Sequence, residues 1–146
     1  MLKHPTRMPT DNTEGTTMSD TSTVTELLAV NRRLLESIAA GDWATYVELC
    51  DPSLTCFEPE ARGQWVEGMD FHRFYFDLGG SSGPVNITVS SPHVRVMGDV
   101  AVISFIRLVQ KLDGNGHPVT ARSEETRVWQ HQGGKWRHVH FHRGVG

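Results

Sequence analysis

The first part of the chain with regular apolar spacing has the period of a helix. Over residues 24–40, apolar side chains recur every three or four positions, which predicts one long amphipathic helix. Thr23 and Glu26 have the spacing of a capping box, so we expect the helix to begin there.

Residues 1–22 lack this pattern. They contain mainly Thr, Ser, Asp, Asn, Pro and Gly, and so little apolar surface cannot offset the entropy of ordering. We therefore predict a disordered tail over 1–22 and one folded domain over 23–146. Because Met18 lies just before the first periodic segment, it is, with Met1 and Met8, a candidate start of the protein.

Shorter elements follow the long helix. Gly41 suits its C-cap, and Asp42 suits the N-cap of a second helix over 43–49. The pattern then predicts short strands over 53–57 and 62–66, an aromatic helix over 67–78 and a glycine-serine loop over 79–83.

Strand alternation replaces helical spacing after Pro84. It predicts long strands over 85–97, 100–112, 119–130 and 135–143, with a tight turn at Asp113-Gly114-Asn115-Gly116. Helices packed on one side of an antiparallel sheet make an α+β fold. Because long strands twist, we expect the sheet to curl around the helices and to leave a cavity.

Composition narrows the class of protein. A chain of 146 residues is long enough for a single core, and its net charge of -3 argues against a general nucleic-acid binder. No apolar run approaches the roughly 20 residues that a membrane helix needs. Cys50 and Cys56 lack CxxC spacing, so we predict two small core residues in a reducing cytoplasm.

Strand alternation places arginines on the same faces as apolar residues. The three sets are Ala101, Ile103, Phe105 and Arg107; Ser123, Glu125, Arg127 and Trp129; and Val139, Phe141 and Arg143. On alternation alone, the simpler interpretation is that the arginines lie at strand ends and reach water. In the alternative they converge inside the sheet. Buried cations then need water, an acidic partner such as Glu125 or a bound anion, and guanidinium suits a carboxylate or phosphate.

Other polar residues carry weaker signals. His138, His140 and His142 alternate on one face of the last strand, and we predict a solvated or interface face rather than a zinc site. No metal site, cofactor, phosphate loop or kinase motif is predicted. The acid–base candidates, none of them distinguished by its spacing, are Glu58, Glu60, Asp70, His72 and Glu125.

The chain resembles the association, or hub, domain of calcium/calmodulin-dependent protein kinase II. The resemblance covers about residues 24–144 and follows one order along the chain. Its longest segments are CDPSLTCFEPEARG (50–63), VEGMDFHRFYF (66–76), SEETRVW (123–129) and GKWRHVHFHR (134–143). The shorter ones are PHVRVMGD (92–99), FIR (105–107) and LDGNG (112–116).

This resemblance implies a cone-shaped fold of the nuclear-transport-factor-2-like superfamily, with a long helix lying in a strongly curved antiparallel sheet. It implies a homo-oligomer in which dimers stack into a ring, which we expect to hold ten to fourteen subunits. It also implies a pocket for small carboxylates of the hydroxybutyrate kind, and this favours convergence of the arginines. The predicted ligand-binding residues are Arg107, Arg127, Arg143, His72, Tyr46, Tyr75 and Glu125.

Two departures from the family change the expectations. The family's loop after FYF carries a tryptophan that moves when ligands bind, whereas DLGGSSGP (77–84) has none, which argues against that gating here. A hub without a kinase segment would act as a stand-alone form in the cytoplasm. We expect no nucleic-acid or membrane partner, and any partner protein would bind in trans.

A second class of function stays open. Relatives with the same cone fold include isomerases, dehydratases and cyclases, and such an enzyme would act here on a small anionic substrate. His72 with Tyr46 or Tyr75 would supply the acid–base groups. An arginine-rich cavity favours anion binding over proton abstraction, so we rank the enzyme second.

Overall fold

A six-stranded sheet supports the helices. The structure, a computed structural model, describes residues 10–145, with side chains from residue 21 onward. The strands lie in the order β2-β1-β6-β5-β4-β3, and all neighbours are antiparallel except β1 and β6, which are parallel. Their bounds are β1 (Cys50–Phe57), β2 (Val66–Glu67), β3 (Val85–Met97), β4 (Val100–Leu112), β5 (Pro118–Gln132) and β6 (Lys135–Gly144).

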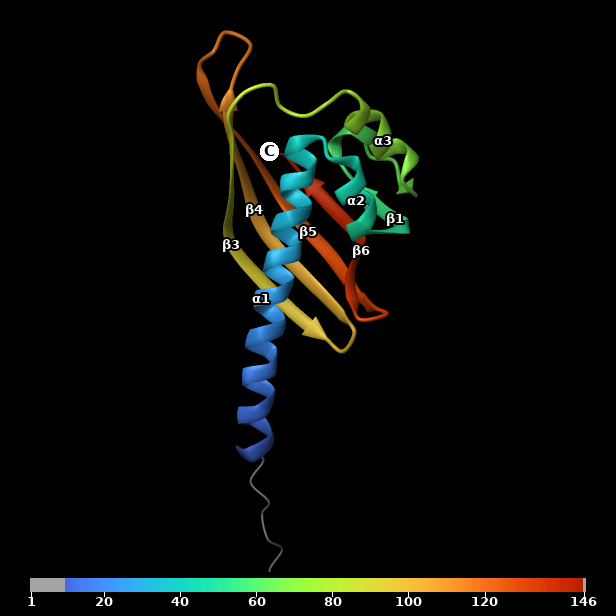
Figure 1. Cartoon of the computed structure of the whole chain (residues 1–146), viewed down its shortest axis with the longest axis vertical. Coiled ribbons are helices and arrows are strands. Elements are labelled where there is room, and N and C mark those ends of the chain that lie inside the picture. The colour runs from blue at the N-terminus through green and yellow to red at the C-terminus, as the bar shows by residue number, and fades with distance from the viewer. Residues whose placement is uncertain (1–9, 146) are drawn as a thin grey trace, which may run out of the picture.

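The helices lie against one face of this sheet. They are α1 (Thr10–Ala40), α2 (Trp43–Leu49) and α3 (Asp70–Asp77), with a 3-10 turn, η1 (Pro59–Ala61), after β1. Figure 1 shows α1 running along β3, β4 and β5, while α2 and α3 gather near β1 and β6. The predicted α+β fold, with a long helix in a curved sheet, is confirmed.

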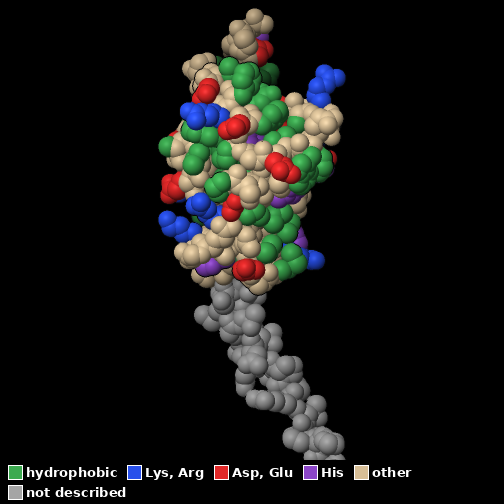
Figure 2. Space-filling model, turned by 90° about the vertical axis from the view of Figure 1, so that its right-hand side faces the viewer, with side chains coloured by type: hydrophobic (Ala, Val, Ile, Leu, Met, Phe, Trp, Pro, Cys, Tyr) green, Lys and Arg blue, Asp and Glu red, His purple; other side chains and the backbone are tan. Residues whose placement is uncertain are grey.

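The outer surface mixes side chains of all kinds. On the face in Figure 2, acidic and basic side chains are interspersed with hydrophobic ones. None of the helices in the described part of the chain is long and apolar enough to cross a membrane.

The buried face of α1 fixes the helix on the sheet. Leu27, Leu34 and Leu35 are fully buried and share one helix face. Between them lies Asn31, which is also buried, and its Oδ1 accepts a hydrogen bond from Trp129 Nε1 at 3.3 Å. An unpaired buried amide costs about 1–3 kcal/mol, so this bond favours one placement of α1 on β5.

α1 begins earlier than the capping box predicts. Its first residue is Thr10, so part of the predicted disordered tail has helical backbone, and residues 1–9 lie outside the described residues. Thr25 Oγ1 donates to Thr21 O at 3.0 Å, a bond typical of threonine inside a helix. Each residue that joins a formed helix adds one hydrogen bond. The helix can therefore continue on the N-terminal side of a capping signal. The domain division at residue 23 stays a prediction.

Two glycines let the loop after α3 cross the end of α1. Gly41 ends α1 with φ +66°, and Asp42 caps α2 by accepting a hydrogen bond from Thr45 N at 3.1 Å, as predicted. A Cβ on Gly80 would lie 2.4 Å from the backbone carbonyl carbon of Ala40. A Cβ on Gly41 would lie 2.6 Å from Gly80 N. Both backbones therefore need glycine for this close approach.

A β-bulge in β6 shifts the alternation of its side chains. Adjacent residues of β5 pair with His138 and His140, so Val139 is an extra residue in the strand. Consequently His138 points into the core and is fully buried. The prediction that it shares a solvated face with His140 and His142 is therefore wrong.

Candidate functional site

Three arginines from three strands line one cavity of about 250 Å³. Arg107 comes from β4, Arg127 from β5 and Arg143 from β6. Their side chains are 11%, 1% and 15% exposed, so the interpretation that they reach water at strand ends is wrong, and they converge instead. The rest of the lining is Ile38, Tyr46, Glu58, Glu60, His72, Tyr75, Phe76 and Phe141.

Glu125 joins two of these arginines from behind the cavity wall. Its Oε1 accepts hydrogen bonds from Arg127 Nε at 2.9 Å and Arg127 Nη2 at 2.6 Å. Its Oε2 accepts one from Ser123 Oγ at 2.7 Å. Burial alone would raise the pKa of Glu125, but the Arg127 and Arg107 guanidiniums and the Ser123 hydroxyl outweigh burial and hold the pKa below its ordinary value. Glu125 is therefore a buried carboxylate that positions cations.

Arg107 is less completely satisfied. Its Nε lies 2.7 Å from Glu125 Oε2, but the contact lacks hydrogen-bond geometry, and this buried nitrogen has no hydrogen-bond partner in the described part of the chain. Burial lowers the pKa of Arg107 to about 10, helped by the like charges of Arg127 and Arg143 and opposed by Glu125. The guanidinium stays protonated at neutral pH, in a position that a further anion would stabilise.

Arg127 is part of the protein core. Its guanidinium lies over the Phe141 ring, 4.4 Å from the centroid, and its Nη1 is 3.4 Å from His138 Nε2. Because arginine only donates, Nε2 accepts, and the proton of neutral His138 sits on Nδ1, which lies 3.5 Å from Cys50 Sγ. Burial, and then the charge of Arg127, lower the pKa of His138 well below its ordinary value. His138 is thus neutral at pH 7.

Arg143 is neutralised by acids from η1 and the residue before it. Its Nη2 forms an ion pair with Glu60 Oε1 and lies 3.8 Å from Glu58 Oε2. The parallel pairing of β1 with β6 sets Phe57 opposite His142, which brings the residues just after β1 beside Arg143. Three arginines at the site are thus balanced by three carboxylates, which are Glu58, Glu60 and Glu125.

Three possible metal-ligating side chains border the cavity. Donor atoms of Cys56, Glu58 and His72 lie within 4.8 Å of one another. His72 Nδ1 is 3.4 Å from Glu58 Oε1, whereas His72 Nε2 is 3.8 Å from Cys56 Sγ, so the two ring nitrogens face different partners. Burial and the Glu58 carboxylate raise the pKa of Cys56 to about 12, so its thiol stays protonated. These contacts fit a packed, hydrogen-bonded cluster.

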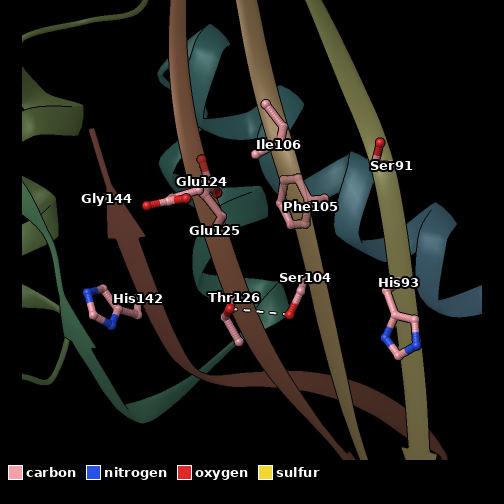
Figure 3. Close-up of a pocket in the computed structure, with 10 residues that line it drawn as sticks. All are labelled: Ser91, His93, Ser104, Phe105, Ile106, Glu124, Glu125, Thr126, His142 and Gly144. Atoms are coloured by element: carbon pink, nitrogen blue, oxygen red, sulfur yellow. Dashed lines mark hydrogen bonds between the residues drawn. The ribbon is translucent and has the colours of Figure 1, made fainter. Parts of the chain in front are cut away.

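A wider hollow of about 470 Å³ lies on the outer face of the sheet. Figure 3 shows Ser104 and Thr126, whose hydroxyls are 3.3 Å apart, with His93 and His142 to either side. Glu125 borders this hollow, whereas the other six predicted site residues are absent from its lining. The arginine cavity therefore remains the candidate site.

The structure brings most of the predicted site residues together. The six that line the cavity are Arg107, Arg127, Arg143, His72, Tyr46 and Tyr75, with Glu125 behind them. Sequence reasoning treated Glu58 and Glu60 as possible catalysts and missed them as partners of Arg143. Asp70, another acid–base candidate, begins α3 and is not among the lining residues. The missed pairing depends on β1 lying beside β6, which no local pattern indicates.

Similar proteins are kinase association domains. The delta subunit of calcium/calmodulin-dependent protein kinase type II from Oryctolagus cuniculus is 48% identical over 146 residues, 92% of this chain. This chain spans 27% of the length of that relative. Among solved structures, the association domain of the C. elegans kinase is 43% identical with a TM-score of 0.83, covering 87% of this chain and 98% of its own. The hub homology domain from Chlamydomonas reinhardtii is 52% identical with a TM-score of 0.80, covering 85% and 98%.

The fold is shared more widely than the sequence. A putative dehydratase of the NTF2-like family from Streptomyces avermitilis is 19% identical with a TM-score of 0.72, covers 87% of this chain and 98% of its own, and shows the fold alone. The model of the calcium/calmodulin dependent protein kinase II association domain family matches residues 23–145. This chain therefore belongs to the calcium/calmodulin-dependent protein kinase II association domain family.

Proposed function

We propose that this chain is a hub that assembles copies of itself into a ring and binds a small carboxylate in the arginine cavity. The proposal of a carboxylate ligand rests on one observation. Arg107, Arg127 and Arg143 line the same cavity, which has aromatic walls. Its volume of about 250 Å³ is below the roughly 300–1,000 Å³ typical of pockets for drug-sized molecules, so the ligand is small.

Family membership and the surface support self-association. Relatives of this chain carry the names association domain and hub. On and just after α3, Phe74, Tyr75 and Leu78 are 61%, 40% and 71% exposed, and clustered exposed apolar side chains suit contact with another protein surface. We propose stacked dimers in a cytoplasmic ring of ten to fourteen subunits, to which any partner protein binds in trans.

Sedimentation velocity of the full chain at micromolar concentration tests the assembly. We expect a species of ten to fourteen times the protomer mass of 16.3 kDa. A monomer under these conditions would contradict the hub proposal.

Titration calorimetry with 4-hydroxybutyrate tests the ligand, with 1,4-butanediol as a matched compound that lacks the carboxylate. Arg107→Gln should weaken binding about tenfold to a hundredfold, because a hydrogen bond to a charged group contributes about 1.5–3 kcal/mol. Arg95→Gln is the control, since Arg95 is an exposed residue of β3. Equal binding by the wild type and Arg107→Gln would remove Arg107 from the site.

Proton-transfer catalysis has weaker support. Burial raises the pKa of Tyr46 well above its ordinary value, so its hydroxyl stays protonated. Tyr75 is 40% exposed, and His72 already contacts Glu58 and Cys56. The three guanidiniums that meet at the cavity are groups that bind anions, which favours a binding module over an acid–base enzyme.

A further inference from the structure

The charges at the cavity form two groups with opposite signs. Arg107 and Arg127 share Glu125, which leaves one positive charge in that buried group. Arg143 lies between Glu58 and Glu60, which leaves one negative charge in the second group. Counting arginines and carboxylates alone, the whole site is neutral, so the second group opposes the attraction of Arg107 and Arg127 for an incoming anion. Departure of one carboxylate of the second group would remove this opposition.

Glu60 is the carboxylate best placed to leave. The side chains of Glu125, Glu58 and Glu60 are 0%, 10% and 35% exposed, respectively. Glu125 accepts hydrogen bonds from the side chains of Ser123 and Arg127, and Glu58 lies against His72 and Cys56. Glu60, by contrast, has one polar side-chain contact among the described residues, its ion pair with Arg143.

Glu60 also lies between two hollows. One is the arginine cavity, and the other is an outer hollow lined by Arg62, Trp65 and Phe71 among other residues. A rotation of one exposed side chain takes nanoseconds or less and can carry the carboxylate from the first hollow toward the second. Arg62 in the outer hollow offers a cation to the displaced carboxylate.

We infer that Glu60 is a built-in competitor of the ligand, which holds Arg143 in the free protein and yields it to a small monocarboxylate. This inference rests on the proposed carboxylate site and adds the charge of the ligand. When Glu60 turns outward, three arginines face two carboxylates, and a single negative charge restores the balance. A dicarboxylate would place a second charge near Glu58, which disfavours it.

The test compares the full-length wild type with Glu60→Gln and Glu67→Gln in calorimetric titrations with 4-hydroxybutyrate. Glutamine keeps the size of the side chain and removes its charge. Glu60→Gln should bind the compound about twofold to fivefold tighter, because the competing, partly exposed ion pair is gone. Glu67→Gln is the matched control, since Glu67 lines the outer hollow, accepts a hydrogen bond from Trp65 Nε1 at 2.8 Å and is absent from the cavity lining.

The possible outcomes separate this inference from the proposed function. If the wild type binds 4-hydroxybutyrate and Glu60→Gln binds it with equal or lower affinity, the role of Glu60 is overturned. The proposed carboxylate site then stands. Absence of binding to both would overturn the carboxylate site itself. Binding that is detectable only in Glu60→Gln would support both. A second measurement on the wild type uses succinate, which should bind at least tenfold more weakly than 4-hydroxybutyrate. Equal affinities would contradict the inference that the site takes a ligand with a single negative charge.

Discussion

Replacement of Glu125 by glutamine should destabilise the folded domain strongly. The variant keeps nearly the same volume but removes the carboxylate that balances two guanidiniums, those of Arg127 and Arg107, which are 1% and 11% exposed. Removing one member of a buried ion pair costs about 3–5 kcal/mol, because the remaining charge stays buried without its partner. That is a large share of the roughly 5–15 kcal/mol that separates most folded domains from their unfolded chains.

Urea unfolding at a fixed protomer concentration measures this loss, since self-association makes the apparent stability depend on concentration. With a urea slope of about 1–3 kcal/mol per molar, a loss of about 3–5 kcal/mol should lower the midpoint by about 1–5 M. Glu36→Gln is the control, because Glu36 is 58% exposed and pairs with Arg32 at 3.1 Å, an interaction expected to contribute less than about 1 kcal/mol. A Glu125→Gln midpoint as close to the wild type as that of Glu36→Gln would refute the reasoning.

Three further measurements probe other parts of the structure. Because the folded-state pKa of His138 is depressed, the unfolded chain binds a proton below about pH 6.5 that the folded chain excludes. The free energy of unfolding should therefore fall as pH drops from 6.5 toward 5, by up to about 1.4 kcal/mol per pH unit, and His138→Gln should flatten this slope in urea titrations. Gly80→Ala should lower the thermal midpoint by several degrees, whereas Gly114→Ala, whose Cβ would meet open space, should not. Burial raises the pKa of both Cys50 and Cys56 to about 12, so neither should react with a thiol reagent at pH 8 until the protein unfolds, and rapid labelling of the native protein would contradict this packing.

Side-chain alternation was a sufficient guide on the regular strands. β4 and β5 pair without a shift, so the residues predicted to share a face with Arg107 and with Arg127 do so. Alternation could not decide whether the arginines reach water, because that depends on how far the sheet curves. The family resemblance supplied this missing information, and the structure agrees with it.

The failures have local physical causes. In β6 the extra residue Val139 reverses the alternation, and nothing in its identity distinguishes it from an ordinary strand valine. The pairing of Glu60 with Arg143 joins residues far apart in sequence through a parallel contact between β1 and β6. α1 begins at Thr10 rather than near the capping box because a capping signal is weak beside the gain from extending an existing helix.

The bulge at Val139 also separates two tasks within one strand. On its N-terminal side, Trp136 and His138 pack the core; on its C-terminal side, Phe141 and Arg143 line the cavity. Changes of length beyond this point can therefore alter the lining of the cavity without moving Trp136 and His138. One residue inserted after Phe141 would turn His142 inward in place of Arg143 and replace a permanent cation with one that titrates near neutrality. A single added codon would thereby make the charge of the cavity depend on pH.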